Sequence, residues 1–192
     1  MRARRVSFGL VVAVTTYAVF AGCTTTVLPP PTNLNVVDTV TLYAIHGTPI
    51  TTPSAYLLNG PVLVYTAQTP TFDFAFDIDS TGTPVLQPFG ALVKVRNDSL
   101  TQPGLLPTGS SFGAMTLAPT SGYGITQSVA VSVESVVLAR SSAQICPDGL
   151  ASALYAKLHV LALDPTRRTI TFEILSDQNC GYVSLVPGLP QQ

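Results

Sequence analysis

Charged side chains are scarce in this sequence, and their scarcity excludes one class of partner. Asp, Glu, Lys and Arg together make up 10% of the 192 residues, whereas typical soluble domains carry about 25%. Beyond the first five residues the basic side chains form no stripe, and a nucleic-acid partner needs one to displace phosphate counterions. We therefore expect no nucleic acid to bind. The surface is expected to consist of Thr, Ser, Gln and Asn, or else to be covered in part by a partner or a membrane.

Residues for metal or acid–base chemistry are equally few. The chain has three cysteines and two histidines, His46 and His159, and they lack the ligand spacing of a zinc site. Its two glutamates are Glu134 and Glu173. A glycosidase needs two carboxylates at a defined separation, and the strand pattern gives no reason for these two to meet. The sequence predicts no catalytic residue, metal or cofactor.

Helical periodicity is rare, and strand patterns take its place. The 16 prolines are spread along the chain, which argues against long helices. Short runs of β-branched and aromatic residues are separated by turn signals such as Asn59-Gly60-Pro61. The pattern predicts an all-β fold, namely a β-sandwich of about seven to nine short, mainly antiparallel strands. A small β-barrel is the alternative.

Individual segments give more specific expectations. Phe72, Phe74 and Phe76 share one face of a strand, which places Asp73 and Asp77 on a face that meets water. The other segments are a strand over 36–46, strands within 85–95, a loop over 97–111, a short strand over 114–118, a strand over 127–139 and one helical turn within 147–153.

The best-defined element is a hairpin near the C-terminus. Asp164-Pro165-Thr166-Arg167-Arg168 forms its turn, because Pro165 presets the φ angle. Because side chains alternate between the two faces of each strand, Glu173 must pair with a basic residue on the outer face, either His159 or Lys157. The inward residues are Leu154, Ala156, Leu158, Val160 and Ala162 on the first arm, and Ile170, Phe172 and Ile174 on the second.

The first 22 residues have the pattern of a secretion signal. Arginines at positions 2, 4 and 5 precede residues 6–22, a stretch of 17 residues without a charge. This is a positive n-region followed by an apolar h-region, and it is shorter than the ~20 apolar residues of a spanning helix. The stretch ends in Phe20-Ala21-Gly22-Cys23, which resembles the lipobox of bacterial lipoproteins. The resemblance covers residues 1–23 alone, and Phe20 stands where leucine is usual.

The resemblance implies a lipid anchor and a location. Lipoproteins are cleaved before the cysteine, so residues 1–22 would be a signal peptide, formed as a helix, and Cys23 would carry acyl chains such as palmitate. Each buried CH₂ contributes about 0.8 kcal/mol to attachment, and more than one chain makes it stable. Thr24, where aspartate would favour the inner membrane, implies the outer membrane, facing the periplasm or the cell surface. Ordinary secretion, an uncleaved anchor and a twin-arginine signal at Arg4-Arg5 are the alternatives.

The mature chain is expected to have one domain behind a tether. Residues 23–35 form the lipidated cysteine and the tether, since Pro29-Pro30-Pro31 favours extended polyproline II. Residues 36–192 then form a single β-rich domain. Removal of residues 1–22 leaves six of the nine basic residues and all 10 acidic residues, so the net charge of the mature chain is about −4. In an oxidising compartment Cys146 and Cys180 are expected to form a disulfide at the base of the C-terminal hairpin.

Three short motifs suggest further chemistry. Gly109-Ser110-Ser111-Phe112-Gly113 fits the pattern of a nucleophile elbow with Ser111 as nucleophile, although the helix that must follow is missing. Asp77, Asp79 and Thr81 place oxygens at alternate positions, as a Ca²⁺ loop does, but Pro88 stands where that loop needs an acid. A hairpin turn explains the same residues. Asn97-Asp98-Ser99 fits a glycosylation sequon.

These features predict a membrane-anchored, extracytoplasmic lipoprotein whose β-sandwich is a binding or structural module. The membrane would be its partner through the lipid anchor, and an envelope protein or a glycan would be its ligand. An envelope-polymer hydrolase is the first alternative, which an exposed Ser111 beside a histidine and an acid would favour. A Ca²⁺-dependent adhesion module is the second.

Overall fold

The fold is that of a computed structural model of the chain, which describes residues 28–93 and 102–191. The predicted signal helix over 1–22, Cys23 and the sequon at 97–99 lie outside these residues. Among the described residues, no helix has the length and apolar character needed to cross a membrane.

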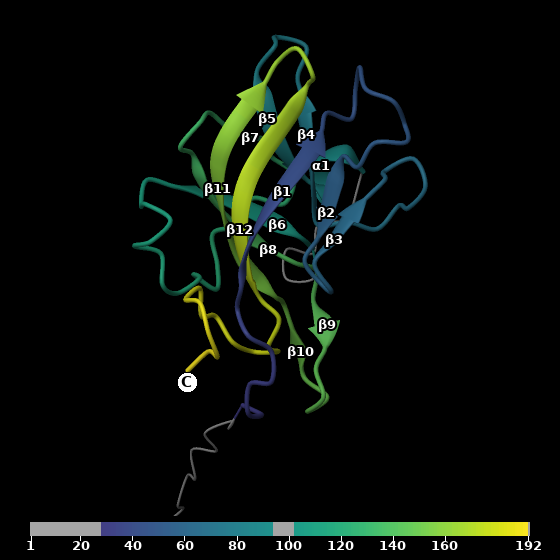
Figure 1. The fold of residues 1–192 in the computed structure, drawn as a ribbon. Helices are drawn as coiled ribbons and strands as arrows, with labels where there is room; N and C mark the ends of the chain where they lie inside the picture. The colour runs from purple at the N-terminus through teal and green to yellow at the C-terminus, as the bar shows by residue number, and fades with distance from the viewer. Residues whose placement is uncertain (1–27, 94–101, 192) are drawn as a thin grey trace, which may run out of the picture.

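Two five-stranded antiparallel sheets pack as a β-sandwich (Figure 1). The first has the order β1-β12-β11-β8-β6 and the second β3-β2-β4-β5-β7, while β9 and β10 form a small third sheet. Neither large sheet closes into a barrel over the described residues, so the sandwich is confirmed. There are more strands than predicted because five have only two or three residues. The elements are β1 (Val37–Tyr43), β2 (Ala55–Leu57), β3 (Val62–Val64), β4 (Phe74–Ile78), β5 (Pro84–Pro88), α1 (Phe89–Leu92), β6 (Gly104–Thr108), β7 (Val129–Ala130), β8 (Val136–Arg140), β9 (Gln144–Ile145), β10 (Ala151–Ser152), β11 (Tyr155–Asp164) and β12 (Thr169–Asp177).

The core lies between the two large sheets and is centred on three aromatic rings. Tyr56 and Phe74 of the second sheet stack with centroids 5.6 Å apart. Both contact Phe172 of the first sheet, at 6.5 and 6.1 Å respectively, and all three side chains are buried. Full burial of a large apolar side chain contributes about 1.5–3 kcal/mol, so these rings stabilise the contact between the layers.

Strands β11 and β12 form the hairpin that the alternation predicts. Val160 pairs with Phe172 and His159 pairs with Glu173. The register therefore gives Glu173 a histidine as its basic neighbour, and Lys157 pairs elsewhere.

A bulge interrupts the inward alternation of β11. The register shifts between Val160 and Ala162, and an extra residue reverses which face the following side chains meet. Ala162 is therefore exposed, and Leu163 packs against the core in its place. The prediction that Ala162 points inward was wrong.

A third layer covers the outer face of the second sheet. Ala55 and Ala75 pair across β2 and β4 on this face, and their small side chains leave room for larger ones above them. Phe72 packs there against Phe89 of α1, with ring centroids 5.2 Å apart. The loop over 44–53 completes the layer, since its Ile45 packs against the same cluster.

Asp73 and Asp77 are buried, 2% and 4% exposed, so the prediction that they face water was wrong. The alternation of β4 holds, but its outer face meets protein. Asp73 accepts hydrogen bonds from the amides of Leu58 (2.7 Å) and Ser142 (3.2 Å), and Asp77 accepts one from the amide of His46 (3.1 Å). Burial raises the pKa of Asp73 to about 6.

Five other segments also differ from the prediction. Strands were expected within 85–95, but β5 ends at Pro88 and the next four residues form the short helix α1. The strand expected over 127–139 is split into β7 and β8, because Glu134 adopts a φ of 71° in the turn between them. The region 97–111 contains strand β6 where a loop was expected. Residues 147–153 belong to the β9–β10 hairpin and hold no helical turn, and 114–118 contains a single isolated bridge.

The N-terminal segment, residues 28–36, lies against the C-terminal segment, residues 178–191. Asn35 and Gly188 exchange two backbone hydrogen bonds, of 2.8 and 3.0 Å. The side-chain oxygen of Asn179 accepts two more from backbone amides of the N-terminal segment, both 2.9 Å. These residues were expected to belong to an extended tether; in the structure they are bound to the domain.

Cys146 and Cys180 lie at disulfide distance, with Cα atoms 5.7 Å apart, in agreement with the predicted pair. Cys146 follows β9, and Cys180 belongs to the C-terminal segment. The pair therefore joins the β9–β10 hairpin to the C-terminal segment, which binds residues 32–35.

Candidate functional site

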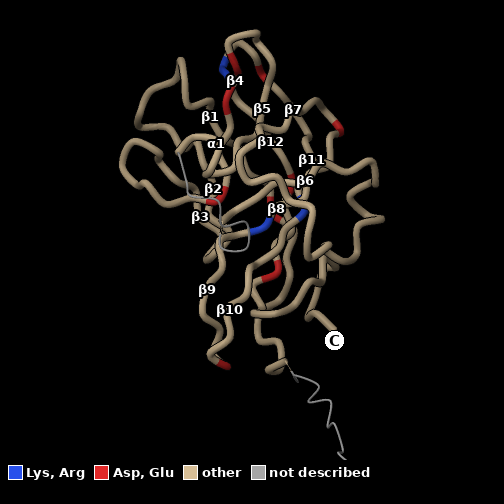
Figure 2. Tube along the Cα trace, turned by 180° about the vertical axis from the view of Figure 1, so that it is seen from behind, with Lys and Arg blue, Asp and Glu red and all other residues tan. Residues whose placement is uncertain are grey.

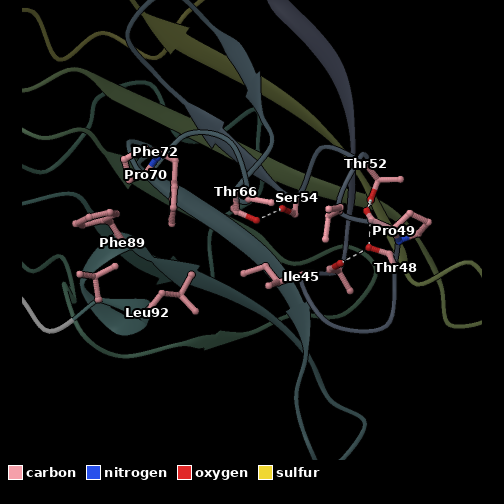
Figure 3. Close-up of a pocket in the computed structure, with 14 residues that line it drawn as sticks. Ile45, Thr48, Pro49, Thr52, Ser54, Thr66, Pro70, Phe72, Phe89 and Leu92 are labelled. Carbon is pink, nitrogen blue, oxygen red and sulfur yellow. Dashed lines mark hydrogen bonds between the residues drawn. The ribbon is translucent and has the colours of Figure 1, made fainter.

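A mostly apolar cavity of about 510 Å³ opens in the third layer (Figure 3). It lies between the loop over 44–53, the loop over 65–72 and helix α1. A volume of this size falls within the ~300–1,000 Å³ that small-molecule sites occupy. Its lining residues are Ala44, Ile45, Thr48, Pro49, Ile50, Thr52, Ser54, Thr66, Ala67, Pro70, Phe72, Phe89, Leu92 and Val93.

The polar groups of the cavity are largely occupied by one another. The hydroxyls of Ser54 and Thr66 lie 2.8 Å apart, and those of Thr48 and Thr52 lie 3.2 Å apart. The Thr48 hydroxyl also lies 2.6 Å from the carbonyl oxygen of Ala44, to which it donates. The walls therefore offer a ligand mainly aliphatic and aromatic surface, which favours an apolar group.

No residue of this cavity was predicted as a site residue. The lining comes from three segments that are separate in the chain and that meet over the outer face of the second sheet. Short loops rich in Thr and Pro carry no motif, so no local signal could have identified them.

A second, polar pocket of about 550 Å³ lies over the outer face of β11 and β12. Its centre is His159, which is held between two carboxylates. Nδ1 lies 2.8 Å from Glu173 Oε1, and Nε2 lies 3.1 Å from Glu134 Oε2. The sequence predicted the pairing of His159 with Glu173 but gave no reason for Glu134 to join it. The positive φ of Glu134 in the β7–β8 turn is what brings it there.

The two carboxylates favour the charged imidazolium. The hydrogen bond to Glu173 is the main cause that raises the pKa of His159, and Glu134 raises it further. Glu134 is exposed to solvent, with 79% of its side chain accessible, whereas the side chain of His159 is 17% accessible. Glu134 is thus the partner that can leave most easily.

The serine loop, residues 109–113, forms one wall of this pocket. The buried ammonium group of Lys157 holds it, donating to the carbonyl oxygens of Phe112 (2.7 Å) and Met115 (3.0 Å). The ammonium also lies 4.3 Å from the centre of the Phe112 ring, a cation–π contact. Burial lowers the pKa of Lys157.

Ser111 is exposed and lines the same pocket as His159, Glu134 and Glu173. This meets part of the condition for a hydrolase. A general base, however, must accept the proton of the serine, and Glu134 occupies Nε2 of His159. The residues that follow Ser111 form a turn rather than the helix of a nucleophile elbow.

The residues of the Ca²⁺ motif make hydrogen bonds to protein groups: Asp77 to His46, and Asp79 to Thr81. Asp77 lies 2.5 Å from the ring nitrogen of His46. Asp79 caps the β4–β5 turn by accepting from the amide and hydroxyl of Thr81 (2.8 and 2.6 Å) and from the amide of Thr83 (2.9 Å). This is the hairpin turn that the motif also fitted. Over residues 28–93 and 102–191, no group of three His, Cys, Asp or Glu side chains is placed to hold a metal ion.

No family model, curated protein or solved structure matches this chain.

Proposed function

We propose that this chain is a lipid-anchored binding module of a bacterial cell envelope, and that the cavity of Figure 3 is its ligand site. The signal-like residues 1–22 and Cys23 support the anchor and an extracytoplasmic location. The cavity carries the binding function, because it combines a volume suited to a ligand with walls whose polar groups are already paired. Its chemistry favours an apolar group, such as an acyl chain or the hydrophobic side chains of an envelope protein, over a glycan.

The anchor is tested by intact mass. The protein purified from bacterial membranes should have the mass of residues 23–192 plus fatty acyl groups, and Cys23→Ala should remove those groups. A mature chain without acyl groups in both preparations would leave a freely secreted domain.

The cavity is tested with an apolar fluorescent probe, N-phenyl-1-naphthylamine, whose emission rises when it leaves water. Ile50→Asp places a carboxylate at the rim on a side chain that is 75% exposed, so the fold should tolerate it. Leu117→Asp is the matched control, because Leu117 is 61% exposed and does not line the cavity. We expect Ile50→Asp to weaken binding about tenfold, equivalent to about 1.4 kcal/mol, and Leu117→Asp to leave it unchanged.

Two results would contradict the ligand site. The wild-type protein could fail to raise the emission of the probe, or both aspartate variants could bind as the wild type does. Ala67→Trp, which introduces a large side chain at a lining position, provides a second variant and should also weaken binding.

A hydrolase remains the second candidate, because the polar pocket gathers Ser111 with His159, Glu173 and Glu134. Activity would require Glu134 to leave Nε2 of His159, so that the imidazole could accept the serine proton. A fluorophosphonate probe tests this, since it reacts with activated serines. Labelling that is lost in Ser111→Ala and kept in Ser110→Ala would support the hydrolase. Absence of labelling in the wild type would end it.

A further inference from the structure

Exposed apolar side chains gather at the end of the domain where the N-terminal segment enters. In Figure 1 the start of the N-terminal segment, the tip of the β9–β10 hairpin and the C-terminus all lie at this lower end. The segments 28–36, 144–152 and 178–191 contain one charged residue, Asp148. The exposed large apolar side chains of these segments are Leu34 (62%), Val36 (61%), Ile145 (75%), Leu150 (53%), Val186 (44%) and Leu189 (53%).

Charged residues lie at the opposite end, around the turns of the β4–β5 and β11–β12 hairpins, as well as in the middle of the domain (Figure 2). Asp79 caps the first turn and Asp164 the second, where it accepts hydrogen bonds from two backbone amides, both 2.9 Å. Arg168 links the second turn to the loop over 44–53 through His46, whose carbonyl oxygen accepts a hydrogen bond of 2.9 Å. The domain therefore has a charged end and a nearly uncharged, partly apolar end.

The length of chain before the domain determines which end can reach a membrane. Leu28 packs on Gly181, which has a φ of 83° and no room for a Cβ beside Leu28. Leu28 is five positions after Cys23, and at no more than ~3.6 Å per position the distance between them is at most about 18 Å. The loop over 44–53 lies farther away, because the seven residues of β1 alone extend about 23 Å. An anchor at Cys23 thus holds the apolar end next to the bilayer.

We propose that this end of the domain rests on the bilayer that holds the anchor, with Ile145 and Leu150 in the boundary between headgroups and acyl chains. The proposal rests on the proposed lipidation of Cys23. The carboxylate of Asp148 accepts a hydrogen bond from the amide of Leu150 (3.0 Å), so the hairpin tip stays at headgroup depth rather than entering the hydrocarbon. The cavity is then presented away from the membrane, toward ligands.

The absence of tryptophan from the chain allows a direct test with single-tryptophan variants. Ile145→Trp is compared with Leu161→Trp, because Leu161 is also exposed (40%), lies in β11 near the turn at the opposite end and does not line the cavity. The acylated full-length proteins are reconstituted into phosphatidylcholine vesicles with or without bromine on the upper acyl chains, since bromine quenches nearby tryptophan. We expect blue-shifted emission and loss of fluorescence for Ile145→Trp alone. Leu189→Trp is a second reporter and should behave in the same way.

The outcomes separate this proposal from the anchor itself. Proteins that float with the vesicles but show no quenching at Ile145→Trp or Leu189→Trp would overturn the contact and leave the anchor intact. Equal quenching at Leu161→Trp would also overturn it, because the domain would then have no preferred orientation. Chains without acyl groups that fail to float would overturn the anchor, and the contact with it.

Discussion

Replacement of Asp73 by asparagine should remove one pH-dependent part of the stability of the domain. The buried Asp73 carboxyl has a pKa of about 6, against an ordinary value of 3.8. A raised folded-state pKa means that the folded protein holds the proton more tightly than the unfolded chain does. The acid therefore stabilises the fold most below pH ~4, and this contribution is lost as pH rises through ~6. About two pKa units at 1.36 kcal/mol each give about 3 kcal/mol.

The assay is urea unfolding of the wild-type protein and Asp73→Asn at several pH values between about 3.5 and 7. Other groups with shifted pKa values, such as Asp177 and His159, are present in both proteins and cancel in the difference. Asparagine keeps one acceptor for the two amides and loses the other hydrogen bond, so its offset is independent of pH. The difference in unfolding free energy should change by about 3 kcal/mol across the window. A constant difference would refute the reasoning.

Three further perturbations test other parts of the structure. Cys146→Ala with Cys180→Ala should lower stability by about 3–4 kcal/mol, since the cysteines are 34 residues apart; a reductant should lower the wild type to the same urea midpoint. Lys157→Met leaves two partly buried carbonyl oxygens without their donor and should lower stability by about 1–3 kcal/mol, with faster amide exchange confined to the serine loop. Gly47→Ala should lower the melting temperature more than Gly60→Ala: both glycines have positive φ, 78° and 75°, but only at Gly47 does an added Cβ meet a neighbour, at 2.8 Å.

Local alternation made the sandwich and its principal hairpin predictable from sequence. A side-chain period of two decides which residues of β12 face the core, and the turn at Pro165 limits the register to two choices. The bulge in β11 was not predictable, because no particular residue type marks the position of an extra residue in a strand. The split between β7 and β8 was missed because valines alternate across it, while the reversal depends on the φ of Glu134.

The sites were less predictable because distant segments build them. Asp73 is bound by the amides of Leu58 and Ser142, which follow β2 and β8 and are distant from it in the chain. His159 and Glu173 could be paired by parity, but Glu134 and Ser111 reach the same pocket through a turn and through the buried Lys157. The apolar cavity has no counterpart in any motif.

Strand β1 connects the N-terminal segment directly to the loop over 44–53, which lines the cavity. A ligand that pulled on the cavity against a fixed Cys23 would therefore load β1 along its own axis. The covalent backbone of β1 would carry most of that force, because both points of attachment lie on the same strand. The anchor and the ligand site are then in mechanical series, and the seven residue pairs with β12 keep the strand between them in its extended form.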